Sequence, residues 1–228
     1  MEIIPNVHRV PGLKRANAYL LLGETVALVD TGLPGDADAI LSTLSELGQS
    51  PADLTRIILT HHHADHTGSL ARLRKKTGAQ VLAHPADAPY ISGETAQPLP
   101  SHPLIGLLFG LVGGRRRLEP IPVEVPLQDG DRLDLLEGAT VVHVPGHTPG
   151  SIALHFPAER LLITGDAVIV RRGRPALPPR FFSQDPEQAA ASIRRLVPLG
   201  AQTLCAGHGD PVVGAAAGQL QAIIEKLA

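Results

Sequence analysis

Short apolar stretches, many of them rich in β-branched residues or alternating with polar positions, recur along the whole chain. This pattern is typical of β-strands, because successive side chains of a strand point to opposite faces. The strands that it predicts lie near residues 3–10, 17–22, 25–30, 55–60, 80–83, 121–127, 131–136, 139–144, 151–156, 160–165 and 203–206.

Helical periodicity lies between and after these stretches. Over residues 36–48 apolar side chains recur on one face, and Gly48 is expected to end the helix. Further helices are predicted near residues 67–77, 185–197 and 215–227. Asp185 precedes Pro186 and is placed to cap the helix that begins there. Strands come first in each half of the chain, which favours two sheets packed face to face and covered by helices over a regular βαβ alternation.

The segment 88–120 interrupts this order, because it is rich in proline and glycine and carries an apolar run over 104–112. That run is shorter than the roughly 20 residues needed to cross a bilayer. It is also too apolar for a solvent-facing loop, so it must be buried against something. We predict an inserted lid that forms an apolar wall of the substrate pocket. The alternatives are a homodimer contact, or docking on a membrane surface together with the arginines at 115–117.

Composition and charge narrow the function classes. The 228 residues suit one domain, 1–228, and the formal net charge of −2 does not indicate a nucleic-acid or anionic-membrane partner. A single cysteine, Cys205, excludes an internal disulfide and fits a reducing compartment. Residues 1–5 lack the pattern of a signal peptide. We therefore expect a cytoplasmic protein that acts on a small molecule.

Four side chains of metal-binding type follow directly on the strand predicted at 55–60. In the run Thr60-His61-His62-His63-Ala64-Asp65-His66, the first and third histidines project to one side of an extended segment and can bind one ion together. Asp65 and His66 fall at the start of the next helix and can turn toward a second ion. A single histidine is more often a packing or surface residue, but an HxHxDH pattern on a strand-to-helix loop indicates a metal site.

The HxHxDH pattern after an apolar strand resembles the signature of the metallo-β-lactamase superfamily, whose fold is an αββα sandwich. Four other segments are similar to the remaining motifs of this family in their order and in their position at strand ends. They are 28–32 with Asp30, 145–151 with His147, 162–166 with Asp166, and 205–210 with His208. The resemblance extends over almost the whole chain and implies an α+β fold.

The resemblance also implies a set of ligands. The expected ligands are His61, His63 and His147 for a first ion, Asp65, His66 and His208 for a second, and Asp166 as a bridge between the two. Asp65 and Asp166 are also the expected catalytic residues. Each ion then has three protein ligands and a shared carboxylate. The implied reaction is hydrolysis, in which a metal-bridging hydroxide attacks the carbonyl of a thioester or lactone-type ester.

The choice of metal and substrate rests on finer details. Nitrogen and oxygen ligands suit two Zn²⁺ ions, and also iron or manganese. Diiron flavoproteins of the superfamily carry a glutamate where this chain has His63, and its β-lactamases carry a cysteine where this chain has Asp166. Zinc and a substrate other than a β-lactam are therefore favoured. The sequences of the motifs around His147 and His208 are most similar to those of glyoxalase II-like hydrolases. Lactonases of the superfamily share the same ligands.

Some features of this branch are not expected here. The sequence ends soon after His208, which leaves no room for the helical substrate domain of full-length glyoxalase II. Recognition of glutathione therefore does not follow from the resemblance. Arg171, Arg172, Arg174 and Arg180 follow the Asp166 motif, and we expect one or two of them to bind a substrate carboxylate unless they form a solvated basic loop.

Three rival functions use the same residues differently. A two-metal phosphodiesterase or nuclease would need a broad basic surface, which the sequence only faintly suggests. A mononuclear iron dioxygenase acting on persulfides would use His61, His147 and Asp166 and leave the second site empty. A non-catalytic binding protein is disfavoured, because all seven expected ligands are present.

The remaining polar residues near these motifs have simpler interpretations. Asp30 either forms a turn or orients a ligand histidine, and the two roles are compatible. His62 is expected to point away from the ligands, and Cys205 to be a buried, inert thiol. The histidines expected to pack or face solvent are His8, His84, His102, His143 and His155.

Overall fold

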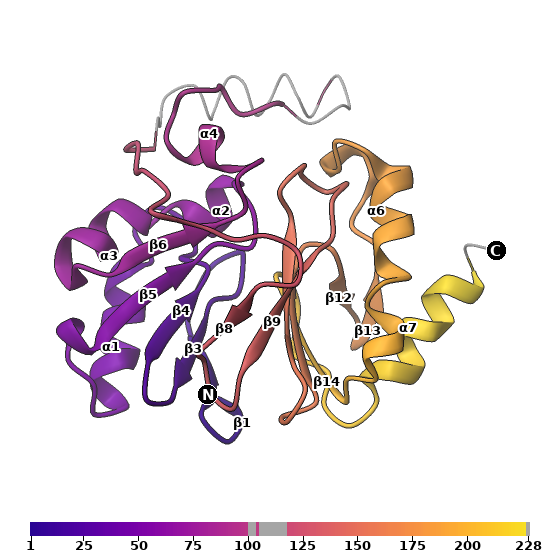
Figure 1. Cartoon of the computed structure of the whole chain (residues 1–228), viewed down its shortest axis with the longest axis horizontal. Helices are drawn as coiled ribbons and strands as arrows, with labels where there is room; N and C mark the ends of the chain where they lie inside the picture. Colours follow the sequence, from indigo (N-terminus) through magenta and orange to yellow (C-terminus); the bar gives the residue numbers. More distant parts are fainter. Residues whose placement is uncertain (100–103, 105–117, 227–228) are drawn as a thin grey trace.

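The computed structural model describes residues 1–99, 104 and 118–226, and it is an αββα sandwich (Figure 1). Two sheets pack face to face, with helices on the outer face of each. The N-terminal half of the chain builds one sheet and its helices, and the C-terminal half builds the other. The predicted fold class is therefore confirmed.

The first sheet has seven strands within the described residues, in chain order. Its strands are β1 (Glu2–Ile4), β2 (Val7–Arg9), β3 (Tyr19–Leu22), β4 (Val26–Val29), β5 (Leu54–Ile58), β6 (Gln80–Ala83) and β7 (Val125–Pro126). β1 to β4 form an antiparallel meander, whereas β4 to β7 run parallel. The carboxyl ends of β4, β5 and β6 therefore meet at one edge of the sheet.

The second sheet has the strand order β14-β11-β10-β9-β8 in the described part of the chain. Its strands are β8 (Arg132–Leu133), β9 (Ala139–His143), β10 (Ile152–Phe156), β11 (Leu161–Gly165) and β14 (Thr203–Ala206). β11 and β14 are parallel and the other pairs are antiparallel. A separate hairpin follows β11 and consists of β12 (Ile169–Arg171) and β13 (Arg174–Ala176).

Helices cover the outer face of each sheet (Figure 1). Those of the first half are α1 (Ala37–Glu46), the 3₁₀ helix η1 (Pro51–Asp53), α2 (Ala64–Thr67), α3 (Leu70–Thr77) and α4 (Ala88–Ile91). Those of the second half are η2 (Arg180–Phe182), α6 (Pro186–Ile193), η3 (Val197–Leu199) and α7 (Ala216–Glu225). None of the helices in the described part of the chain has the length and apolar composition required to span a bilayer.

Both faces of the central strands are buried, which explains why they are apolar almost throughout. On β10, Leu154 and Phe156 face the layer between the two sheets, whereas Ala153 faces the layer under α6 and α7. On β4, Leu28 packs toward α1 and α3, and its neighbour Val29 packs between the sheets. Alternation of apolar residues along each strand thus fills three apolar layers.

The structure corrects several predicted elements. The strand predicted at 3–10 is the β1–β2 hairpin, which turns at Asn6 with φ of +66°. The helix predicted at 67–77 is α3, which begins at Leu70, and the short helix α2 lies separately before it. The hairpin β12–β13 was not predicted, because its arginines, Gly173 and Pro175 are untypical of strands. Asp185 caps α6 as predicted, since its carboxylate accepts hydrogen bonds from the backbone N–H groups of Glu187 and Gln188.

Only the start and end of the predicted insert at 88–120 can be compared with the structure. It begins with α4, and Leu104 is exposed. The rest of the apolar run at 104–112 and the arginines at 115–117 lie outside the described residues. The lid therefore stays a prediction.

The packing between the sheets predicts a large cost for truncating Phe156, whose side chain is completely buried there. Phe156→Ala should lower the free energy of unfolding by about 3–5 kcal/mol, measured by denaturant titration. Val213→Ala is the control, because Val213 is exposed, and its effect should stay within about 0.5 kcal/mol. A loss below about 1 kcal/mol for Phe156→Ala would contradict tight packing between the sheets.

Candidate metal centre

All seven residues expected as ligands lie on loops at one end of the sandwich. His61, His63, Asp65 and His66 follow β5, on the loop into α2 and on α2 itself. His147 follows β9, Asp166 follows β11 and His208 follows β14. The two halves meet directly at this end, where the backbone N–H of Ile152 donates to the carbonyl of Thr60 at 2.9 Å.

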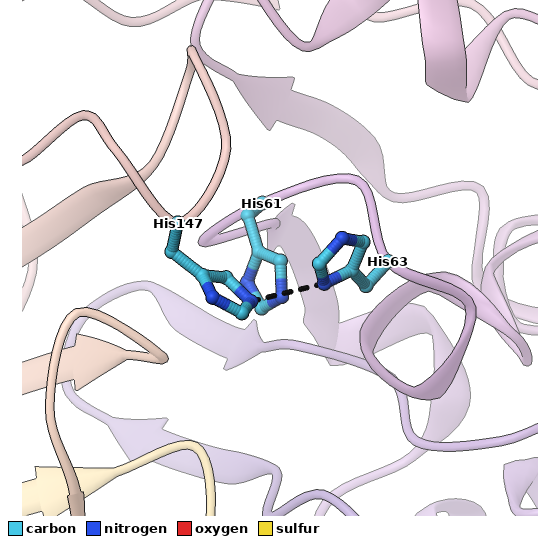
Figure 2. Close-up of side chains that lie close together, drawn as sticks. All are labelled: His61, His63 and His147. Atoms are coloured by element: carbon cyan, nitrogen blue, oxygen red, sulfur yellow. Dashed lines mark hydrogen bonds between the residues drawn. The ribbon is translucent and has the colours of Figure 1, made fainter. Parts of the chain in front are cut away.

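The seven side chains form three overlapping groups whose ligand atoms lie within 4.8 Å of one another. The groups are His61, His63 and His147; His61, His66 and Asp166; and Asp65, His66 and His208. The rings of the first group converge from two separate segments of the chain (Figure 2), with His147 Nε2 only 3.0 Å from His63 Nδ1. The first and third groups are the two triplets that the sequence predicts.

Asp166 lies between the two triplets. Its Oδ2 is 3.5 Å from His147 Nε2 and 3.2 Å from His208 Nε2, and its Oδ1 is 3.5 Å from His66 Nε2. One carboxylate therefore contacts histidines of both triplets.

Three buried polar atoms at the centre have no hydrogen-bond partner among the described residues: His61 Nε2, His66 Nε2 and Asp166 Oδ1. Leaving a buried polar atom unsatisfied costs about 1–3 kcal/mol, so such atoms are rare in native proteins unless something else binds them. A divalent cation accepts electron pairs from all three. The donor set therefore fits a divalent metal.

Asp30 fixes the orientation of two of these rings. Its Oδ2 accepts a hydrogen bond from His66 Nδ1 at 2.8 Å and another from the Thr60 hydroxyl at 2.7 Å. Since the Thr60 hydroxyl has a single hydrogen, its oxygen must accept from His61 Nδ1, 3.0 Å away. Both rings thus donate a hydrogen bond from Nδ1 and turn Nε2 toward the centre. Asp30 orients ligand candidates, and it also has a turn-like backbone with φ of +60°.

Two further histidines, His208 and His147, are held in the same way. His208 Nδ1 lies 3.3 Å from the carbonyl of Arg15, and His147 Nδ1 lies 3.4 Å from the hydroxyl of Ser183. Each contact leaves the Nε2 of that ring free to face Asp166. Partners of this kind, bound to the second ring nitrogen, are usual for histidines that ligate metals.

Burial and charge prepare most of these histidines to bind as neutral rings. Burial, together with the neighbouring imidazoles, holds the pKa of His61 and His63 well below the ordinary value. Burial also lowers the pKa of His147, although Asp166 opposes the shift. Burial alone would raise the pKa of Asp166, but the surrounding histidines outweigh it and lower that pKa. Neutral imidazoles and an ionised carboxylate are the forms that bind metals.

His66 behaves differently when no metal is bound. Burial lowers its pKa, but the carboxylates of Asp30 and Asp166 more than offset this effect and raise the pKa to about 10. At neutral pH a metal ion must therefore displace a proton from His66 when it binds.

The residues with simpler interpretations lie outside the three groups. His62 is fully buried and stacks on Tyr90, with ring centroids 4.3 Å apart. His84 and His143 stack on each other at 4.1 Å. Cys205 is buried, and burial raises the pKa of its thiol. His102 lies outside the described residues.

Sequence analysis missed two polar residues that bind the backbone of the ligand loops. Asp87 is completely buried and accepts a hydrogen bond from the N–H of His62 at 2.8 Å. Asn17 donates from its side-chain amide to the carbonyls of Ala206 and Gly209, at 2.9 and 2.7 Å. Nothing in the local sequence marks either residue, since their partners are distant in the chain.

The contacts of Asp30 predict the effect of Asp30→Asn. An amide nitrogen there would face groups that are themselves donors, so the rings of His61 and His66 lose their fixed orientation. Metal affinity, measured by competition with a chelator, should fall by about 10–100-fold. Asp53→Asn is the control, because Asp53 accepts hydrogen bonds from Ser50 at the opposite end of β5. An unchanged affinity in Asp30→Asn would refute this role.

The same variant has a pH signature in chelator-treated protein. His66 has a pKa of about 10 in the fold and an ordinary value of 6.5 when unfolded. Its charge therefore stabilises the fold fully below pH 6.5, and this stabilisation is lost as pH rises toward 10. The stability difference between wild type and Asp30→Asn, measured by denaturant titration from about pH 6 to 10, should shrink with rising pH. A difference that grows over this range would contradict the pairing.

Comparisons with known proteins agree with the fold and the motifs. The model of the Metallo-beta-lactamase superfamily matches residues 11–208. The chain is 32% identical over 221 residues to the probable metallo-hydrolase YflN of Bacillus subtilis, covering 87% of this chain and 82% of that protein. It is 35% identical over 209 residues to the hydroxyacylglutathione hydrolase of Fuscovulum blasticum, covering 89% of this chain and 66% of the relative, so it spans about two thirds of that enzyme's length.

A solved structure extends the comparison to the whole fold. The crystal structure of a metallo-beta-lactamase family protein from Thermus thermophilus superposes with a TM-score of 0.78 at 27% identity, covering 99% of this chain and 80% of that chain. The family match, the αββα layers and the two ligand triplets agree with one another. The chain belongs to the metallo-β-lactamase superfamily, in its glyoxalase II-like branch of metal-dependent hydrolases.

Proposed function

We propose that this protein is a dinuclear zinc hydrolase that cleaves a thioester or a lactone-type ester of a small acyl substrate. The observation that carries the proposal is the pair of ligand triplets joined by Asp166, with buried lone pairs at its centre. The proposed ligands are His61, His63 and His147 for one ion, Asp65, His66 and His208 for the other, and Asp166 for both. Five imidazoles among seven ligands favour zinc, with iron as the second candidate.

The two triplets differ in their access to solvent. In the first triplet only His63 is partly exposed, whereas in the second triplet His66 is buried and the side chains of Asp65 and His208 are 29% and 31% exposed. Asp65 and His208 lie close to each other, with 3.5 Å between Asp65 Oδ2 and His208 Nε2. We therefore infer that the substrate approaches from the side on which His63, Asp65 and His208 are partly exposed, so that it meets members of both triplets.

Two divalent ions held by these residues would lower the pKa of a bound water and stabilise negative charge on a carbonyl oxygen. The chain's own residues provide the remaining functions. His61 and His147 exclude water from the inner side, since both are almost fully buried. Asp166 stays ionised, with its Oδ2 between His147 of the first triplet and His208 of the second and its Oδ1 toward His66. Asp65 Oδ2, which is partly exposed, is the group we assign to hold the proton of the attacking water and return it to the leaving group.

The choice of a carbonyl ester rests on the relatives. Hydroxyacylglutathione hydrolases share 35% identity with most of this chain, and their name describes cleavage of a thioester. We propose the same bond type here, with an acyl group that the apolar insert at 88–120 helps to recognise. A phosphodiesterase would need more positive charge than the net charge of −2 provides.

Metal content and activity test this proposal together. Metal-replete protein should contain two equivalents of zinc by elemental analysis, and Asp166→Ala should lose at least one. A screen of thioesters, lactones and aryl phosphodiesters should show turnover of a carbonyl ester, which His61→Ala lowers more than about a hundredfold.

Other results would select other functions. One iron per chain with oxygen consumption in the presence of a persulfide would establish the dioxygenase instead. Turnover of only the phosphodiester would establish the nuclease class. A protein that binds no metal would refute every one of these activities.

Arg180 is the arginine that we propose to bind a substrate carboxylate. It is exposed and opens the segment that packs against His147, where the N–H of Gln184 donates to the carbonyl of His147 at 3.1 Å. Arg171 and Arg174 lie instead on the β12–β13 hairpin, whose Val170 N–H donates to the carbonyl of His208 at 2.8 Å. Both positions adjoin a ligand loop, but only Arg180 adjoins the loop of the first triplet.

Arg180→Ala should raise KM about tenfold for a thioester with an acyl carboxylate and leave kcat unchanged, because a charged hydrogen bond contributes about 1.5 kcal/mol. A neutral thioester should show no change in KM. The control is Arg72→Ala, on the outer face of α3, where Arg72 pairs with Asp38. Equal KM values for the anionic substrate in wild type and Arg180→Ala would leave Arg180 as part of a solvated loop.

A further inference from the structure

The centre is assembled from two halves of the chain that have no covalent link near the site. Four of its side chains precede residue 67, and the other three follow residue 146. A metal site tolerates little change in ligand distance, commonly about 0.2 Å. The loops of the two halves must therefore be fixed relative to each other close to the ligands. Among the described residues, Asp87 provides such a connection beside the first triplet and Asn17 provides one beside the second.

Asp87 connects the two loops that carry the first triplet. Its Oδ2 accepts hydrogen bonds from the N–H of His62 at 2.8 Å and from the hydroxyl of Thr148 at 2.7 Å, and its Oδ1 accepts from the N–H of Gly150 at 2.7 Å. His62 lies between His61 and His63, and Thr148 follows His147. One fully buried carboxylate thus binds the backbone on both sides of the gap.

The surroundings of Asp87 leave it little freedom to move. A Cβ at Gly150 would lie 2.7 Å from the carboxyl carbon of Asp87, so the two segments are in direct contact. The stacked rings of His84 and His143 join the same two segments of the chain a few residues away. The ring of His143 also donates to the carbonyl of Pro149 at 2.8 Å.

Asn17 connects the two halves beside the second triplet. Its side-chain amide donates to the carbonyls of Ala206 and Gly209, and its backbone N–H donates to the carbonyl of Gly207 at 2.7 Å. These three carbonyls flank His208 on both sides. The hydroxyl of Tyr19 adds a further hydrogen bond to Ala206, at 2.6 Å. The segment that contains Asn17 also supplies the Arg15 carbonyl that lies 3.3 Å from His208 Nδ1.

We propose that Asp87 and Asn17 are positioning residues, each of which sets the geometry of one metal ion: Asp87 that of the ion at His61, His63 and His147, and Asn17 that of the ion at Asp65, His66 and His208. The proposal rests on the dinuclear centre proposed above. Neither residue touches an ion or the substrate. Each acts through the loop that it holds.

Near-isosteric substitutions separate the two roles. Both oxygens of Asp87 accept hydrogen bonds. In Asp87→Asn the amide nitrogen replaces one of these oxygens, so in either orientation of the amide it faces a group that is itself a donor. Thr148→Val removes one donor to Asp87 without changing any charge, so it tests geometry apart from electrostatics. Asn17→Leu keeps the approximate shape of the side chain and removes both donors without adding a charge. Asp53→Asn is again the distant control.

The experiment is a titration of metal-free protein with Co²⁺, followed by visible absorption spectroscopy and by competition with a chelator. His147→Ala and His208→Ala provide reference spectra for the loss of the first and of the second ion. In Asp87→Asn the affinity of the first ion should fall about 10–100-fold, while that of the second ion changes less than about threefold. Thr148→Val should also lower the affinity of the first ion. In Asn17→Leu the two affinities should change in the reverse pattern. Circular dichroism confirms that each variant is folded.

The outcomes distinguish this proposal from the one on which it rests. If the wild type takes up two Co²⁺ and either variant weakens both ions equally, the residues merely stabilise the fold and the positioning roles are wrong. Wild-type affinities in Asp87→Asn and Asn17→Leu would overturn the proposal as well. If the wild type itself takes up a single Co²⁺, the dinuclear centre fails, and with it the role of the residue beside the missing ion.

Discussion

The buried lone pairs at the end of the sandwich, where the ligand loops of the two halves meet, impose the constraint on which the rest of this structure depends. His61 Nε2, His66 Nε2 and Asp166 Oδ1 face one small volume and find no hydrogen-bond donor among the described residues. A protein that only had to fold would replace such a cluster with apolar side chains, because unsatisfied polar atoms are costly. The cluster is therefore maintained for something that it binds.

The hydrogen bonds around the cluster limit the free-energy cost of these unsatisfied polar atoms. Asp30 and Thr60 accept hydrogen bonds from Nδ1 of two rings, which turns Nε2 of each ring toward the centre. The sandwich supplies the rigid support, since Asp30 and Thr60 follow the parallel strands β4 and β5 and are joined to each other by 2.8 and 2.7 Å hydrogen bonds. Local strain at Asp30, with its φ of +60°, is part of the same arrangement.

Much of this architecture could be predicted from the sequence, because the signals are local. The strand periods and the motif from His61 to His66 each occupy a few consecutive residues. The β12–β13 hairpin could not be predicted, because its strands are only three residues long and carry the exposed Arg171 and Arg174. The contacts of Asp87 and Asn17 were equally hidden, since their partners lie 61 and 189 residues away. Such contacts depend on how the two sheets pack, which no local pattern encodes.

The central claim is that two metal ions bind at the end of the sandwich where the ligand loops meet, one beside each triplet and both beside Asp166. Anomalous diffraction at the zinc absorption edge, from crystals grown with zinc, tests it most directly. The account predicts two peaks about 3.5–4 Å apart, one bounded by His61, His63 and His147 and the other by Asp65, His66 and His208. A single peak, or peaks away from Asp166, would contradict it.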